Sequence, residues 1–103
     1  MSAQLENGAR FNFIRITARH ELENTAAVVY RVDVEMPSSE RHETQCIMSP
    51  THKEIQWMDT EPDPPLADWI IKMRDSLARK IQRSGARGQW PRKMYVWRPG
   101  PRI

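Results

Sequence analysis

The pattern of hydrophobic and polar residues predicts one long helix in the second half of the chain. Between residues 64 and 85, apolar side chains recur at intervals of three or four positions, which is the spacing of one side of an α-helix. The repeating positions are Leu66, Ile70, Met73, Leu77 and Ile81. Trp69 and Ile71 widen this apolar side, and the residues expected largely opposite it are Asp68, Lys72, Asp75, Arg79 and Gln82.

The sequence also indicates where this helix begins and ends. Asp63 can accept a hydrogen bond from a free N–H of the first turn, and Pro64 suits the first helical position because it has no N–H to satisfy there. Gly85 is expected to close the helix in the left-handed conformation, after several cationic residues in the last turn. The predicted helix therefore runs from Pro64 to Gly85.

Four segments ahead of this helix have the composition and alternation of strands: residues 10–19, 25–36, 41–49 and 53–58. The second is the clearest, because apolar residues fill every second position, as in a strand with one buried face. Those positions are Ala26, Val28, Tyr30, Val32, Val34 and Met36. In the third segment His42, Thr44, Cys46 and Met48 share one face, and in the fourth Ile55 and Trp57 are expected to face inward.

The alternation is imperfect in the first segment. Phe11 and Phe13 fall on one face, whereas Ile14 and Ile16 fall on the other. Either both faces of this strand are covered in places, or a bulge shifts the register between Phe13 and Ile14.

The segment after the helix, residues 90–98, allows three interpretations. Its aromatic and β-branched residues favour a strand, but Pro91 also suits the start of a single helical turn, and an extended segment packed on the domain is the third alternative. The order β-β-β-β-α-(β) predicts an α+β fold, with an antiparallel sheet of four or five strands and the helix on one face. We expect a flexible arm at residues 1–9, a single domain at 10–98 and a tail at 99–103.

Charge is distributed unevenly along the 103 residues, although the net charge is only +3. Residues 1–63 contain six Lys/Arg and eleven Asp/Glu, a net charge of −5, whereas residues 64–103 contain ten and two, a net charge of +8. Cys46 is the single cysteine, which excludes an intrachain disulfide and suits a reducing compartment, so we expect a cytoplasmic protein. No stretch has the apolar length of a signal peptide or membrane span, and no membrane contact is expected.

Histidine and cysteine offer two kinds of candidate chemistry, and neither is complete. His42 and Cys46 share a strand face, with His52 one turn later, but a structural zinc site needs four ligands, so a buried thiol is the simpler interpretation. Cys46 paired with either histidine would resemble an activated nucleophile. Its nearby residue Glu43 is negative, however, and nothing in the sequence lowers the pKa of the thiol.

An acidic loop precedes the helix. Asp59, Glu61 and Asp63 could bind a divalent cation or act as acid and base. The loop lacks the glycine and distal glutamate of a calcium loop, and Asp63 already serves as the expected helix cap. We therefore expect no catalytic residues, no metal and no cofactor.

The basic C-terminal half is the remaining signal, because its cations alternate with aromatic residues. The candidate nucleic-acid or anion-binding residues are Arg83, Arg87, Trp90, Arg92, Lys93, Trp97 and Arg98. Such side chains neutralise phosphates and stack on unpaired bases. The favoured alternative is structural: the tryptophans anchor the C-terminal segment to the core, and the arginines are neutralised by Asp33 and Glu35 on the sheet.

The sequence resembles no family that we recognise, so its function is inferred from these features alone. We expect a non-enzymatic binding or adaptor domain that interacts with another protein, or with itself as a homodimer through an exposed strand edge. Binding of nucleic acid or another polyanion through the basic half is the alternative. An enzyme that uses Cys46 or the acidic loop at residues 59–63 is a second alternative.

Overall fold

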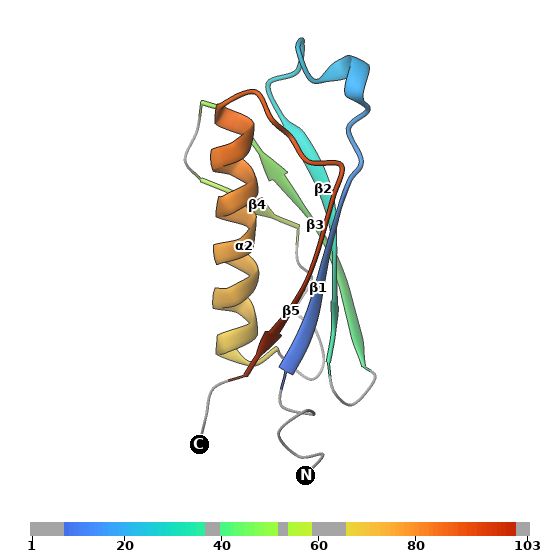
Figure 1. Cartoon of the computed structure of the whole chain (residues 1–103), viewed down its shortest axis with the longest axis vertical. Helices are drawn as coiled ribbons and strands as arrows, with labels where there is room; N and C mark the ends of the chain where they lie inside the picture. Colours follow the sequence, from blue (N-terminus) through green and yellow to red (C-terminus); the bar gives the residue numbers. More distant parts are fainter. Residues whose placement is uncertain (1–7, 37–39, 52–53, 59–65, 101–103) are drawn as a thin grey trace.

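The computed structural model describes residues 8–36, 40–51, 54–58 and 66–100. In this part of the chain, a five-stranded antiparallel sheet packs against one α-helix (Figure 1). The elements are β1 (Gly8–Arg15), a 3-10 helix η1 (Arg19–Glu21), β2 (Val28–Glu35), β3 (Arg41–Met48), β4 (Gln56–Trp57), α2 (Asp68–Ala86) and β5 (Lys93–Pro99). The strand order is β4-β3-β2-β1-β5, with antiparallel neighbours throughout. The predicted α+β fold is confirmed, and it has five strands.

The segment after the helix forms the fifth strand. Residues 93–99 pair with β1 from Ile14↔Lys93 to Gly8↔Pro99, so the strand is the correct interpretation of this segment. β5 does not pair with β4, which precedes the helix in sequence. The helix α2 therefore joins the two opposite edges of the sheet, and it lies along one face on the way (Figure 1).

The core lies between that face of the sheet and one side of α2. The fully or almost fully buried apolar residues are Ala9, Phe11, Phe13, Val28, Tyr30, Val32, Val34, Cys46 and Met48 from the sheet, and Ile70, Leu77, Ala78 and Ile81 from the helix. They include most of the alternate positions predicted for β2 and β3 and three of the five positions of the helical stripe, whereas Ala26 lies ahead of β2 and is exposed. Burial of a single leucine or isoleucine contributes about 1.5–3 kcal/mol, so this contact is the main source of stability.

The first strand differs from the prediction at both ends, because it spans Gly8–Arg15 and not residues 10–19. It begins at Gly8, so Gly8 and Ala9 belong to the sheet and not to an arm. Its register with β2 is unbroken from Arg10 to Arg15, which excludes a bulge between Phe13 and Ile14. The irregularity comes later, where the N–H groups of Ile16 and Thr17 both donate to the Val29 carbonyl, at 2.8 and 3.4 Å. At the other margin of the sheet, Pro99 of the predicted tail belongs to β5.

The helix begins later than predicted. It starts at Asp68, and its N-cap is Ala67, which has an extended backbone and makes no side-chain capping hydrogen bond. Asp63 is therefore not the cap, and it lies outside the described residues. A physical reason is the second proline, at position 65, because a proline disfavours the helical conformation of the residue before it and so argues against a start at Pro64.

The helix also ends later than predicted, and a different glycine closes it. Gly88 has the left-handed conformation, with a φ of 84°. The Gly88 N–H donates to the Gly85 carbonyl at 2.8 Å, and the Gln89 N–H donates to the Ser84 carbonyl at 2.9 Å. These two bonds form a Schellman motif. Gly85 lies inside the helix, where a Cβ would overlap the ring of Trp90, so glycine is required there for close packing.

Two side chains of α2, Ile71 and Gln82, are placed differently from the prediction, and the prediction assigns a third, Arg74, to neither side. Ile71 is 42% exposed and does not widen the apolar side, whereas Gln82 is buried, with its amide 3.4 Å from the Ser49 carbonyl. Arg74 is buried as well, because it lies four residues after Ile70 and three before Leu77, on the same side of the helix. Its guanidinium lies over the Trp57 ring, 4.1 Å from the ring centroid. Arg74 thereby packs α2 against β4.

Candidate functional site

The strand β5 has one free edge in the part of the chain that the structure describes. The Arg15 N–H donates to the Arg92 carbonyl at 2.9 Å, which fixes the alternation of backbone groups along the strand. In an antiparallel ladder, the residues that hydrogen-bond to a given neighbour alternate along the strand. The backbone N–H and C=O groups of Met94, Val96 and Arg98 therefore bond to β1, and the backbone groups of the intervening residues point away from β1. We name the outward set Lys93, Tyr95, Trp97 and Pro99 the β5 edge. It offers three N–H donors and four carbonyl acceptors, since proline has no N–H.

The side chains of the β5 edge lie on the sheet face that α2 does not cover. Tyr95 is 57% exposed and Trp97 is 44% exposed. Arg10 lies opposite Trp97 and Asn12 lies opposite Tyr95 on the neighbouring strand. The Trp97 ring also lies over Gly8, where a Cβ would collide with it. An aromatic pair therefore borders the same strand edge that presents free backbone groups.

Two carboxylates of this open face, Asp33 and Glu35, form ion pairs with arginines from the first half of the chain. The pairs are Arg10–Glu35 at 3.7 Å, Arg31–Asp33 at 3.9 Å and Arg41–Asp33 at 3.8 Å. The prediction that C-terminal arginines neutralise Asp33 and Glu35 is therefore wrong for the described residues, because strands β1, β2 and β3 supply the cations. Within those residues, no ion pair is formed by the cations at positions 92, 93 and 98.

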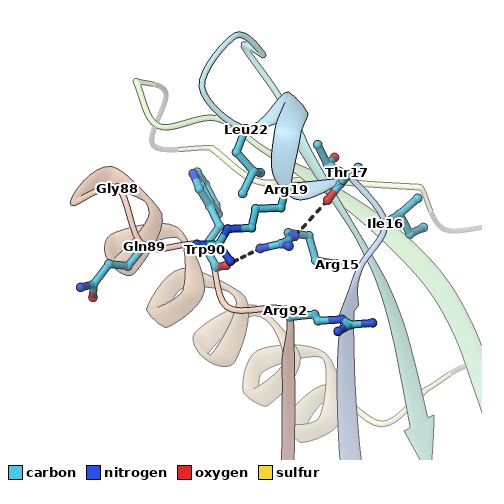
Figure 2. Close-up of a pocket in the computed structure, with 10 residues that line it drawn as sticks. Arg15, Ile16, Thr17, Arg19, Leu22, Gly88, Gln89, Trp90 and Arg92 are labelled. Carbon is cyan, nitrogen blue, oxygen red and sulfur yellow. Dashed lines mark hydrogen bonds between the residues drawn. The ribbon is translucent and has the colours of Figure 1, made fainter.

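A cleft of about 660 Å³ lies at the end of the sheet where β1 leads into η1 and the segment after α2 returns (Figure 2). It is lined by Arg15, Ile16, Thr17, Ala18, Arg19, Leu22, Gly88, Gln89, Trp90 and Arg92. We name it the arginine cleft. Arg15 spans its floor, because its Nε donates to the Thr17 carbonyl at 2.9 Å and its Nη1 donates to the Trp90 carbonyl at 2.6 Å.

The seven candidate anion-binding residues lie in several places. Trp90 and Arg92 line the arginine cleft. Lys93 and Trp97 lie on the open face. Side chains alternate along the strand, so the half-buried Arg98 lies on the face that α2 covers. Arg83 and Arg87 are exposed at the end of α2.

Sequence reasoning missed the two cations from β1 and η1 that reach the cleft. Arg15 and Arg19 stand far from the basic half in sequence and look like ordinary surface residues. No sequence signal identifies them, because the return of residues 88–92 to the end of β1 creates the cleft.

The buried thiol is a poor nucleophile in this environment. Cys46 is fully buried and free, and burial raises its pKa to about 12, although the nearby Arg74 opposes the shift. A thiolate is therefore scarce at neutral pH. Among the described residues, no three His, Cys, Asp or Glu side chains are grouped to hold a metal. His52 and the acidic loop lie outside those residues.

Comparison with known proteins adds no assignment. No protein-family model, curated protein or solved structure matches the chain. In the described residues, no helix combines the length and apolarity needed to cross a membrane.

Proposed function

We propose that this domain is a protein-interaction module that binds an extended, acidic segment of a partner protein along the β5 edge. The observation that carries this proposal is the coincidence of free backbone groups and exposed aromatic rings on one strand, at Tyr95 and Trp97. An unpaired strand edge is a template for another strand. In strand addition, main-chain hydrogen bonds provide affinity and alternate side chains provide specificity.

The other edge of the sheet is less suitable. β4 has only two residues and covers β3 at Cys46 and Ile47. The next position of β3 is also occupied, since the Gln45 carbonyl accepts the Met58 N–H at 2.9 Å. The uncovered remainder, from Arg41 to Thr44, is short and carries no Phe, Tyr or Trp side chain.

Charge supports an acidic partner over a second copy of this chain. Arg92, Lys93 and Arg98 lie on or beside the β5 edge, and no described carboxylate pairs with them. Two copies paired antiparallel about Tyr95 would place Arg92 of one copy opposite Arg98 of the other. Like charges directly opposite each other in a ladder are destabilising, whereas an acidic strand would be attracted to the same cations.

The open face is less favourable for nucleic acid. Glu43 lies on it without a described ion pair, and the arginines beside Asp33 and Glu35 are already paired, so a phosphate backbone that crossed the sheet from β5 would meet one unneutralised carboxylate and engaged cations. An extended peptide at the edge itself avoids β2 and β3. This difference favours protein over nucleic acid as the partner.

A capped heptapeptide of alternating glutamate and valine tests the proposal. It should shift the amide NMR signals of Lys93, Tyr95 and Trp97, whereas the same peptide with lysine in place of glutamate should not. Tyr95→Pro removes an outward N–H without removing a bond to β1, so it should abolish binding. Tyr95→Ala is the matched control, because it loses the ring but keeps the N–H and should retain weaker binding.

Three outcomes would contradict the proposal. They are no binding of the acidic peptide, binding that survives Tyr95→Pro while the β1–β5 amides stay protected, and equal binding of both peptides. Binding of a thymidine decamer at these amides would assign the edge to nucleic acid instead. If sedimentation showed that the free protein dimerises and that Tyr95→Pro abolishes the dimer, the β5 edge would be assigned to a second copy of the chain.

A further inference from the structure

The arginine cleft is a second site, separate from the β5 edge, and its walls are held in place by several hydrogen bonds. Tyr30 donates its hydroxyl to the Pro91 carbonyl at 2.5 Å, beside the Arg15 bond to Trp90. The Schellman motif at Gly88 fixes the preceding turn. The cleft is therefore preorganised, which reduces the ordering cost of binding.

Positive charge in the cleft is not balanced by its lining. Three arginines line it, and none of the lining residues is Asp or Glu. Figure 2 shows the Arg15 and Arg19 side chains converging beside Trp90, while Arg92 points away from them. Within the described residues, neither Arg15 nor Arg19 forms an ion pair. An anion between these two guanidinium groups would offset their mutual repulsion.

Arg15 retains donors for such an anion. A guanidinium has five N–H groups, and the described bonds of Arg15 use one on Nε and one on Nη1. Arg19 is exposed at its margin and has no described side-chain hydrogen bond. Two forked donors that face one another suit the several oxygens of a phosphate group, which arginine binds in bidentate fashion.

The opposite wall of the cleft is apolar. The Trp90 indole lies between Gly85 and the cleft, and Leu22 from the segment after η1 faces it (Figure 2). The volume of about 660 Å³ is within the range of small-molecule sites, about 300–1,000 Å³. We propose that the arginine cleft binds a small phosphate monoester with a flat ring, its phosphate on Arg15 and Arg19 and its ring against Trp90.

The test uses adenosine monophosphate as the probe, with titration followed by NMR and calorimetry. Saturable binding should shift the Arg15 Nε–H and Trp90 indole N–H signals, and adenosine should bind at least about tenfold more weakly because it lacks the charge-assisted hydrogen bonds. Arg19→Gln should weaken binding of adenosine monophosphate by about tenfold or more. Arg83→Gln is the matched control, since it removes one exposed cation from α2 outside the cleft and should change the affinity less than about twofold.

The source of the phosphate is tested with a 5′-phosphorylated thymidine trinucleotide. Binding of the trinucleotide without binding of adenosine monophosphate would overturn the assignment to a small molecule. Equal weakening by Arg19→Gln and Arg83→Gln, or no saturable shift at Arg15 and Trp90, would overturn the site itself. None of these variants alters the β5 edge, so this proposal and the proposed peptide binding stand or fall independently.

Discussion

Gly85 provides a test of how closely the segment after the helix packs on α2. Alanine at this position adds a Cβ that would overlap the Trp90 ring. Inside a helix, alanine is otherwise favoured over glycine by about 0.8–1.0 kcal/mol. Helix propensity and packing therefore predict opposite signs for the effect of Gly85→Ala on the free energy of unfolding.

The packing term should be the larger of the two. The atoms in conflict belong to a large ring, and the backbone of the same residue is held by the Arg15 bond to the Trp90 carbonyl at 2.6 Å. Overpacking of this kind costs about 1–3 kcal/mol, so the net loss of stability should be about 0–2 kcal/mol. In a Trp90→Leu background the ring is absent, and Gly85→Ala should instead stabilise the domain by up to about 1 kcal/mol.

Urea unfolding followed by circular dichroism gives the four stabilities of this double-mutant cycle, with an expected coupling energy of about 1–3 kcal/mol. Gly88→Ala is the control, because no atom lies within 4 Å of its added Cβ and its φ is 84°. It should cost about 1–2 kcal/mol for the left-handed backbone in both backgrounds. If Gly85→Ala stabilised the otherwise wild-type protein as much as the Trp90→Leu variant, the close contact between ring and helix would be refuted.

Two further predictions concern the core. Leu77→Asp should unfold the domain because it buries an unpaired charge, whereas Lys80→Gln on the exposed side should leave the melting temperature nearly unchanged; equal melting temperatures would show that the helix face is misassigned. Burial raises the pKa of the Cys46 thiol from its ordinary value near 9 to about 12, so the unfolded state loses its proton first and stability should fall above pH 9, by up to about 1.4 kcal/mol per pH unit. Cys46→Val should reduce the fall of the free energy of unfolding with pH, measured by urea titrations between pH 8 and 10.5. An unchanged fall would show that the buried thiol is not its source.

Periodicity accounts for what the sequence predicted correctly. The alternate residues of β2 and the stripe through Ile70, Leu77 and Ile81 depend only on local geometry, and they face each other in the core. Arg74 follows the same geometry, but a charged residue is expected outside, so its burial under Trp57 was missed. At this position the charge of arginine predicts exposure, whereas the helical period predicts burial. The side chain is buried because its stem is apolar and its guanidinium can lie on an aromatic ring.

The ends of elements and the sites depend on contacts between distant residues. In the sequence, Gly85 and Gly88 are equally suitable as the glycine that ends the helix. Only the structure shows that Gly85 permits close packing of Trp90 and that Gly88 supplies the left-handed turn. The free edge of β5 could not be predicted either. It exists because the chain returns to β1 and not to β4 after the helix.

The pairing of β1 with β5 also changes what the charge asymmetry of the sequence means. The acidic first half and the basic second half are not two surfaces of the molecule, because β1 lies between β2 and β5 and carries cations of its own. Arg10 neutralises Glu35 on one side of β1, while Arg15 reaches the segment after the helix at the other end. The acidic half therefore neutralises Asp33 and Glu35 with its own arginines, and it contributes Arg15 and Arg19 to the cleft. The cations near β5 that form no described ion pair lie on or beside the strand that carries exposed Tyr95 and Trp97 and free backbone groups, and this combination supports the proposed peptide strand over a phosphate chain spread over the sheet.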